Sequence, residues 1–500
     1  MLDARVRVDW QVLQATGTLQ FSLRRNLAVT ALRDADTGAG LTYDRDEQGA
    51  VTVHLPARLA PGQRFSLQIE YSGEINGPRG GESGNRVRDY IGPEGTYVRF
   101  EAGWYPNVWG DSATARLRIA VPSGWTYLSS GRRSEDGAAW EITHPVIGIS
   151  FCAALYELHE DRAGRVPIQT YLFPKHRKRG PEFVREAADS LALLERLYGP
   201  YPFDKFALAE IPDLYGGGHG DQSFIMLQER TFTEPFDGEF VTHEMAHNWW
   251  GGLIACTETE FLAQGFATYS QALWREHIQG PHGLRQAMRS QAGAVLMHSM
   301  DPAKETSCFE SDSGPLLYEK GAWILHMLRH IMGDEQWMSA VHQFARDNAG
   351  RAVKCRQFEA AMEAAYGQPL DWFFRQWLYG TGVPWVRAEV LGMVGNQARV
   401  RVTQVTVQDA DDSGEWQTSP GSFRLPVELA LETANGTVRH GLWLTGPQAE
   451  LTISVPGPVT RLSVDPGCWL LDHSNGLVGK LSAEMGELER ELGRELGTLH

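Results

Sequence analysis

The stretch from Val241 to Trp250 constrains this chain more than any other, because its residue spacing is typical of a metal site on a helix. His243 and His247 are four positions apart, so they lie on one face of a helix, and Glu244 points toward the same site. The stretch lacks Pro and Gly and has apolar residues at helical spacing, which favours a helix. We therefore expect His243 and His247 to bind one zinc ion.

The same motif predicts a reaction class. Zinc held by three protein ligands keeps a fourth position for water and lowers the pKa of that water toward neutrality. Glu244 is then the expected general base, because a carboxylate beside such a water can take its proton. The pattern indicates hydrolysis. The alternative is a pair of structural histidines on a buried helix, which so short a motif does not exclude.

Composition narrows the partners and the compartment. The net charge of −16 argues against nucleic acid or anionic membranes as the main partner. No apolar run approaches the length of a membrane span, and the start of the chain has no basic segment leading into an apolar one. The five cysteines are odd in number and widely spread, so a disulfide framework is not expected. We expect a cytoplasmic protein, and its charge favours cationic or neutral substrates.

Hydrophobic periodicity divides the 500 residues into four parts. Two-residue alternation predicts a β domain at 1–175, and helical periodicity predicts a mainly helical domain at 176–382. Alternation returns at 383–475, which favours a small β-sandwich. A tail at 476–500 has Leu and Met at spacings of three and four but also three glycines. It is expected to be a helix that docks on its own chain, with self-association as the alternative.

The individual elements follow from the same periodicities. Helices are expected at 183–197, 241–250, 264–278, 281–298, 319–332, 335–347 and 356–365, and strands at 5–10, 51–55, 116–121, 207–211, 398–402, 425–431 and 451–455.

Three segments together resemble the gluzincin aminopeptidase family, which includes alanyl aminopeptidase and leukotriene-A hydrolase. They are 243–251, 261–269 and 318–321, and the weaker likeness of the flanking β regions extends to about 1–475. The resemblance implies a saddle-like N-terminal β domain, a thermolysin-like catalytic domain and one zinc ion. It also implies that Tyr318 donates its hydroxyl to the oxyanion that forms on the substrate carbonyl. A packing tyrosine at the start of a helix is the alternative.

The third metal ligand departs from the family pattern. Gln264 stands where the family has a glutamate, and the connection from His247 is shorter than in the family. An amide oxygen can bind zinc but brings no charge, so the affinity should fall unless the geometry compensates. Glu260, one helical turn earlier, or Glu258 could supply the carboxylate instead. An empty or weakly occupied site is the remaining alternative.

The substrate anchor departs as well. The family uses a Gly-Ala-Met-Glu-Asn segment along the substrate backbone, and its glutamate binds the free amino terminus. The corresponding segment here is 217–221, and Gly220 takes the glutamate position. Gly217 and Gly218 would let the backbone approach a substrate closely, and Asp221 or Glu101 could bind the ammonium group. The alternative for Asp221 is an ordinary turn residue.

The motifs together favour a zinc-dependent amide or peptide hydrolase that resembles an aminopeptidase. Two alternatives stay open because of Gln264 and Gly220. One is a catalytically impaired relative that binds peptides or serves in assembly. The other is a zinc hydrolase of a non-peptide or N-blocked amide.

Overall fold

The structure is a computed structural model of the chain. It describes residues 1–75, 89–108, 111–213, 218–299, 306–410, 416–420 and 423–473. The chain divides into two compact units. The first consists of Met1–Ala192, Pro200–Ala255 and Ala349–Ala352. The second consists of Leu193–Gly199, Cys256–Asn348 and Val353–His500.

The first unit begins with two small antiparallel sheets. One contains β1 (Leu2–Gln11), β6 (Arg64–Gly73) and β3 (Leu27–Asp34), in that order. The other contains β2 (Thr16–Ser22), β5 (Ala50–Leu59) and β4 (Tyr43–Arg45), in that order. The expected strands at 5–10 and 51–55 lie in β1 and β5, where more and less exposed side chains alternate as the sequence predicts.

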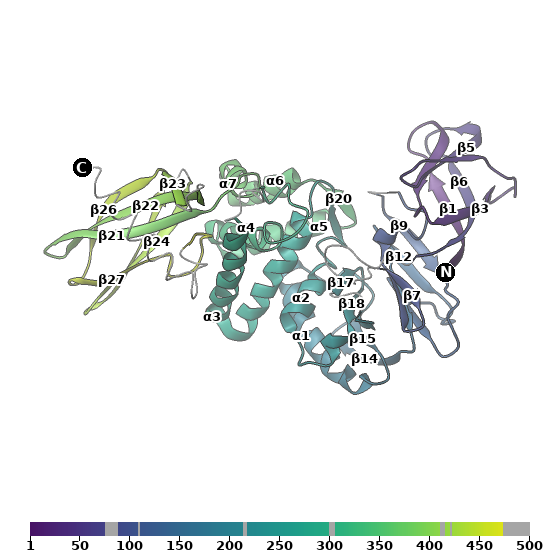
Figure 1. The fold of residues 1–500 in the computed structure, drawn as a ribbon, viewed down its shortest axis with the longest axis horizontal. Helices are drawn as coiled ribbons and strands as arrows, with labels where there is room; N and C mark the ends of the chain where they lie inside the picture. Colours follow the sequence, from purple (N-terminus) through teal and green to yellow (C-terminus); the bar gives the residue numbers. More distant parts are fainter. Residues whose placement is uncertain are drawn as a thin grey trace. The chain divides into compact units, whose positions relative to one another are not determined.

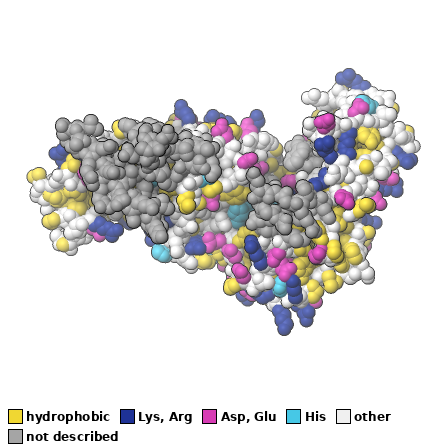
Figure 2. Space-filling view, viewed as in Figure 1, with side chains coloured by type: hydrophobic (Ala, Val, Ile, Leu, Met, Phe, Trp, Pro, Cys, Tyr) yellow, Lys and Arg dark blue, Asp and Glu magenta, His cyan; other side chains and the backbone are white. Residues whose placement is uncertain are grey.

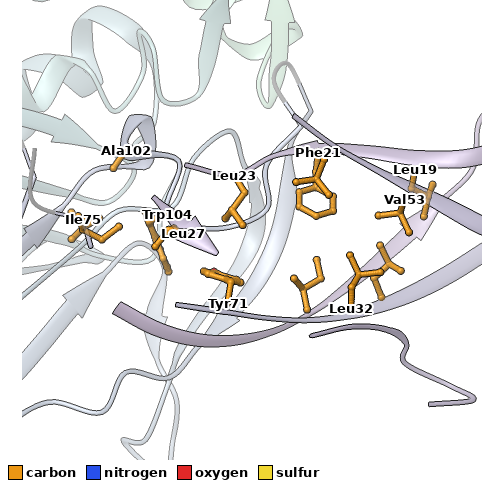
Figure 3. Packing of buried hydrophobic residues seen from close by; sticks show 14 of the residues in the cluster. Leu19, Phe21, Leu23, Leu27, Leu32, Val53, Tyr71, Ile75, Ala102 and Trp104 are labelled. Atoms are coloured by element: carbon orange, nitrogen blue, oxygen red, sulfur yellow. The ribbon is translucent and has the colours of Figure 1, made fainter. Parts of the chain in front are cut away.

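A hydrophobic core joins these two sheets. Figure 3 shows Phe21 of β2 and Val53 of β5 on one side of it, with Leu32 of β3 and Tyr71 of β6 on the other. All four side chains are buried. Burial of each such side chain contributes about 1.5–3 kcal/mol. The alternation along the strands therefore has a direct structural cause, since one face of each sheet covers the other.

Two further sheets complete the β-rich N-terminal region. The first contains β10 (Thr126–Ser129), β13 (Phe151–Ala154), β8 (Gly95–Val98) and β7 (Tyr90–Gly92), in that order. The second contains β11 (Arg132–Arg133), β12 (Trp140–Val146) and β9 (Ala113–Leu117), in that order. The strand expected at 116–121 was placed too late, because β9 ends at Leu117. Leu117 pairs with Trp140, the first residue of β12, so no partner strand continues beyond it. The short helix η1 (Phe100–Ala102) carries Glu101.

A five-stranded mixed sheet follows within the same unit. It contains β14 (Glu157–Ala163), β15 (Val166–Leu172), β16 (Phe206–Ile211), β18 (Phe224–Gln228) and β17 (Gly218–Asp221), in that order. Strands β15, β16 and β18 are parallel, whereas β17 is antiparallel to β18 and lies at the edge. Helix α1 (Gly180–Tyr198) connects β15 to β16. Helix α2 (Gly238–Ala246) packs against β17 and β18 (Figure 1).

This sheet extends across the domain boundary predicted between residues 175 and 176. Strands β14 and β15 lie before that boundary in sequence, and β15 pairs with β16, which lies after it. A buried cluster is also continuous across it. Tyr97 and Trp140 from the N-terminal region share this cluster with Ala209 and Phe224 of the mixed sheet.

The second unit contains most of the helices. They are η4 (Phe261–Gly265), α3 (Phe266–Ser299), α4 (Glu319–Met332), α5 (Asp334–Asp347), α6 (Cys355–Tyr366) and α7 (Asp371–Trp377). The helices predicted at 319–332, 335–347 and 356–365 are confirmed as α4, α5 and α6. The two predicted at 264–278 and 281–298 form one bent element, α3, which is interrupted at Gly280 with φ 64° just before Pro281. Strands β19 (Ile254–Cys256) and β20 (Arg351–Val353) pair where the chain crosses between the units.

The second unit ends in two antiparallel sheets. One contains β21 (Pro384–Val394), β22 (Gln397–Ala410), β23 (Trp416–Pro420) and β26 (Gln448–Ser454), and the other contains β25 (Gly436–Leu444), β24 (Leu425–Thr433) and β27 (Val459–Val464). The strands predicted at 398–402 and 425–431 lie inside β22 and β24, and β26 holds most of the one at 451–455. The helical tail predicted at 476–500 lies outside the described residues.

The fold is thus multidomain, with a β-rich N-terminal region and a helical domain, as the sequence predicts. None of the described helices has the length and apolar content needed to cross a membrane. The face shown in Figure 2 carries both basic and acidic side chains.

Candidate metal centre

Helix α2 presents the two predicted histidine ligands together. Asp237 begins the helix by accepting a hydrogen bond from Phe240 N at 3.1 Å, which satisfies one of the unpaired N–H groups of the first turn. His243 lies on the last turn, and His247 directly follows the helix with φ −60° and ψ −18°, so the helical spacing continues through it. The centroids of the two imidazole rings are 5.1 Å apart, and their planes meet at 81°.

The hydrogen bond of His247 uses Nδ1 and leaves the other ring nitrogen, Nε2, available to a metal. Its Nδ1 lies 3.1 Å from the carbonyl oxygen of Trp250, which can only accept, so Nδ1 carries the hydrogen. The lone pair is then on Nε2, and metal-binding histidines are commonly oriented by a carbonyl in this way. Burial lowers the pKa of His247 to about 4, although the Trp250 hydrogen bond opposes this. The ring is therefore neutral near pH 7, as a ligand must be.

Glu244 is buried between α2 and the edge strand. Its side chain faces β17, where the Gly220 N–H donates a hydrogen bond to the carboxylate. Burial raises the pKa of Glu244 to about 8, and the Gly220 hydrogen bond partly counters that rise. The carboxyl group is thus buried and hydrogen-bonded to the edge strand.

Two glycines of β17 permit this close packing. A Cβ at Gly218 would lie 2.5 Å from Glu244 Oε1, and a Cβ at Gly220 would lie 2.4 Å from the Glu244 backbone oxygen and 2.6 Å from His247 Cβ. A side chain at Gly220 would require movement of α2 or of the strand, whereas one at Gly218 would displace the side chains of Glu244 and Phe240. Gly220 therefore lies against the helix and has no room for the glutamate that the family carries there. Gly217, the other predicted glycine, lies outside the described residues.

A buried polar cluster that the sequence reasoning missed fixes the turn between β17 and β18. Asn248 Oδ1 accepts hydrogen bonds from Tyr201 Oη at 2.9 Å and from Ser223 N at 2.8 Å. Ser223 has φ 72°, which is strained for a residue with a side chain. The buried Lys205 Nζ donates to Ser223 Oγ at 3.0 Å and to Ser129 O at 3.1 Å. Asn248 directly follows the histidine motif, and this position could have identified it from the sequence. No neighbouring residue in the sequence marks Lys205 in the same way.

The other face of β17 carries an acidic cluster. Side chains alternate along a strand, so His219 and Asp221 point away from α2. His219 Nε2 lies 3.9 Å from Asp221 Oδ2 and 4.0 Å from Glu101 Oε2. The structure thus brings the two predicted anchor acids, Asp221 and Glu101, to one histidine. Sequence reasoning did not single out His219.

Burial dominates the electrostatics of this cluster. It raises the pKa of Asp221 to about 7, although a hydrogen bond from Ser150 opposes the rise. Burial and the nearby Arg99 guanidinium lower the pKa of His219 to about 3, so this ring is neutral. Arg99 is itself paired with the buried Asp89 at 3.2 Å.

The second unit places Gln264 and Tyr318 on touching elements. Gln264 lies in η4, and Tyr318 is the residue that precedes α4. These elements meet at two glycines, since a Cβ at Gly265 would lie 3.3 Å from the Gly321 carbonyl carbon and a Cβ at Gly321 would lie 3.1 Å from Gly265 Cα. Gln264 and Tyr318 are therefore carried on adjacent turns.

The alternative carboxylates occupy different positions. Glu260 immediately precedes η4, and its carbonyl oxygen accepts from Gln264 N at 2.8 Å. Glu258 Oε2 accepts from Cys355 N at 3.3 Å, and its Oε1 lies 3.6 Å from Lys354 Nζ. The Glu258 carboxylate thus serves the start of α6, where a negative charge is favourable.

The donor set that these residues offer fits zinc only if an amide takes part. Within the described part of the chain, no cluster of three or more His, Cys, Asp or Glu side chains could hold a metal ion. Gln264 Oε1 is buried, and none of the described residues donates a hydrogen bond to it. A buried acceptor without a donor costs free energy, and a bound cation would relieve that cost. An imidazole nitrogen and an amide oxygen are each chemically suitable as zinc ligands.

Comparison with known proteins agrees with the motifs. The model of the peptidase family M1 domain matches residues 187–377. Aminopeptidase 2 of Candida albicans is 21% identical over 530 aligned positions, which cover 95% of this chain and 56% of that protein. Aminopeptidase N of Haemophilus influenzae is 26% identical over 209 positions, which cover 39% of this chain and 23% of that protein. The chain therefore spans about half the length of the first relative and less of the second.

A solved structure shares the fold. The crystal structure of a two-domain M1 zinc metallopeptidase mutant bound to L-arginine superposes with a TM-score of 0.63 at 20% identity, covering 75% of this chain and 89% of that one. Together with the match to residues 187–377, these likenesses confirm the resemblance inferred from the motifs. Residues 187–377 therefore match a peptidase family M1 domain, and the chain resembles the gluzincin aminopeptidases.

Proposed function

We propose that this protein is a zinc-dependent hydrolase of amide or peptide bonds with aminopeptidase-like chemistry. One observation carries the proposal. The imidazoles of His243 and His247 are 5.1 Å apart beside the buried Glu244, which receives the Gly220 N–H. Within a peptidase M1 domain, this arrangement is best explained by hydrolysis at a metal.

Each residue has a defined role in the proposed reaction. Zinc, when bound, supplies Lewis acidity and a water of near-neutral pKa. Glu244 would act as the general base that takes a proton from the attacking water and passes it to the leaving amine. Tyr318 donates its hydroxyl to the oxyanion on the substrate carbonyl, and a phenol can do this without carrying a charge itself.

We propose Gln264 as the third ligand in preference to Glu260 or Glu258. The resemblance assigns this position to Gln264, and its buried oxygen accepts no hydrogen bond from any residue that the structure describes. Glu258 is engaged at the start of α6, which leaves it a weaker candidate. The expected consequence of the neutral amide is a lower zinc affinity than a glutamate would give.

We further propose that the acidic face of β17 selects the substrate. Asp221 and Glu101 converge on His219, and an ammonium group between the two acids would return negative charge to the buried Asp221. On the other face, Gly218 brings the strand backbone close to Glu244. A peptide with a free amino terminus is therefore the proposed substrate.

Two observations favour a second candidate function. Gln264 brings no negative charge, and Gly220 has no room for the glutamate with which the family binds the amino terminus of the substrate. A catalytically impaired relative that binds peptides would explain both. A zinc hydrolase of N-blocked amides would explain the second alone.

Metal analysis combined with activity distinguishes these functions. The hydrolase proposal predicts one zinc per chain by elemental analysis and release of an amino-terminal residue from a panel of aminoacyl p-nitroanilides. A chelator should abolish this release, and added zinc should restore it. Zinc-replete protein that cleaves no free-amine substrate but cleaves acetylated ones would support the N-blocked alternative. Protein that binds peptides, binds no zinc and cleaves no amide would support the catalytically impaired relative.

The substitution Gln264→Glu tests the ligand assignment. It adds a charged oxygen at the proposed ligand position, so we expect zinc to bind at least about 10-fold more tightly in a chelator competition assay. Glu260→Gln is the matched control and should leave the affinity unchanged. An unchanged affinity in Gln264→Glu, or a loss in Glu260→Gln, would contradict the assignment.

A further inference from the structure

Two thiols far apart in sequence lie within reach of each other in the second unit. Cys256 Sγ and Cys355 Sγ are 3.6 Å apart, and neither is in a disulfide. Cys256 is the last residue of β19, and Cys355 is the first residue of α6. A hydrogen bond from Thr257 N to Val353 O at 3.0 Å holds the two segments together beside the pair. The contact therefore belongs to a strand pairing and not to a mobile loop.

The two thiols have different surroundings. Cys256 is partly exposed, whereas Cys355 is buried. The Cys355 thiol and the backbone N–H groups of Glu258 and Thr259 all donate toward the Cys256 sulfur, and they lower the pKa of Cys256. The pKa of Cys355 is raised, mainly because its thiol is the donor to Cys256. This asymmetry is typical of a reactive cysteine next to a resolving one.

We propose that Cys256 and Cys355 form a redox-active dithiol that a peroxide converts into an intramolecular disulfide. The Cys256 thiolate attacks one peroxide oxygen, the O–O bond breaks, and a sulfenic acid forms while water or an alcohol leaves. The Cys355 sulfur then attacks Cys256 Sγ, the S–O bond breaks, and water leaves as the S–S bond forms. The two thiols are oxidised by two electrons in total, and the peroxide is reduced by the same two.

The disulfide would connect two ends of a long segment. Gln264 and Tyr318 both lie between Cys256 and Cys355 in sequence. Oxidation would therefore fix the start of this segment, just ahead of η4, to the start of α6. This modification site is independent of the proposed hydrolase activity, because it needs neither zinc nor substrate.

Mass spectrometry of the full chain tests the proposal. After brief treatment with hydrogen peroxide and alkylation, cleavage after glutamate should yield the peptides 245–258 and 336–359 as one linked species. That species should be lighter by two hydrogen atoms than the sum of the two reduced peptides, and dithiothreitol should separate them. In Cys355→Ala, the sulfenic acid on Cys256 should persist and react with dimedone.

A matched variant controls for general oxidation. Cys308 is also in the second unit and is fully buried, and burial raises its pKa to about 12, so Cys308→Ala should form the linked species as wild type does. No linked species in wild type, a link to another cysteine, or a link between two chains would overturn the proposal. So would sulfinic acid on Cys256 as the main product. Because wild-type protein alone gives this result, the test does not depend on whether a variant folds.

Discussion

The substitution Gly218→Ala tests the geometry around the proposed base, because its effect on activity should be much larger than its effect on stability. The new methyl group would lie 2.5 Å from Glu244 Oε1 and 2.7 Å from the end of the Phe240 ring, whereas ordinary contact begins at 3.4 Å. The Glu244 carboxylate must therefore move by roughly 1 Å. A 1 Å misplacement of a catalytic group costs about 10²-fold in rate.

The cost to folding should be small. All three atoms that the methyl group meets are at the ends of side chains that can turn away, and alanine loses less backbone entropy than glycine in a strand. We expect the free energy of unfolding to change by less than about 1 kcal/mol. The substitution should thus lower kcat about 10²-fold while the urea unfolding curve hardly shifts.

Gly220→Ala provides the contrast. Its methyl group would lie 2.4 Å from the Glu244 backbone oxygen, so the strand or the helix must move as a whole. This overpacking costs about 1–3 kcal/mol. Gly220→Ala should therefore lose both activity and stability.

Gly17→Ala is the control for the same chemical change at an open position. A Cβ there meets nothing within 4 Å, so both activity and stability should stay at wild-type values. Initial rates on an aminoacyl p-nitroanilide and urea unfolding followed by fluorescence measure the two quantities. A Gly218→Ala protein with the kcat of wild type would refute the proposed position and role of Glu244.

Three further changes test individual side chains. Glu244→Gln removes the base but keeps the shape, so kcat should fall about 10²–10⁴-fold while elemental analysis still finds zinc. Tyr318→Phe should lower kcat about 10²–10³-fold with little change in KM, since the hydroxyl acts on the oxyanion; an equal rise in KM would contradict that role. Burial raises the pKa of Asp221 from 3.8 to about 7, so its contribution to stability is complete below pH 3.8 and is lost as the pH rises to about 7. Asp221→Asn should remove this loss, as urea unfolding across that pH range will show.

The sequence predicted those features that depend on local periodicity. The helix at His243 follows from the four-residue spacing, and the rings of His243 and His247 lie 5.1 Å apart, although α2 ends at Ala246 and not at residue 250 as predicted. Helices α4 and α5 lie where the apolar spacing places them. The break at Gly280 was visible because glycine followed by proline cannot continue a helix.

Features that depend on long-range pairing could not be predicted in the same way. Asn248 acquires its role only because folding brings Ser223 to its side chain, and Cys256 meets Cys355 only through a strand pairing. No local pattern encodes such contacts. Gly220 is a different case. The comparison with the family pattern showed that a glutamate is missing there, and the packing against α2 explains why this position has no side chain.

The mixed sheet determines how this protein can be divided for study. A fragment that starts at residue 176, or at 187 where the family match begins, would lack β14 and β15 and leave β16 with a bare edge. It would also expose Ala209 and Phe224, which the N-terminal region covers, and such a surface invites aggregation. The region that matches the M1 family is therefore best expressed together with everything that precedes it, because residues outside that segment supply part of its interior.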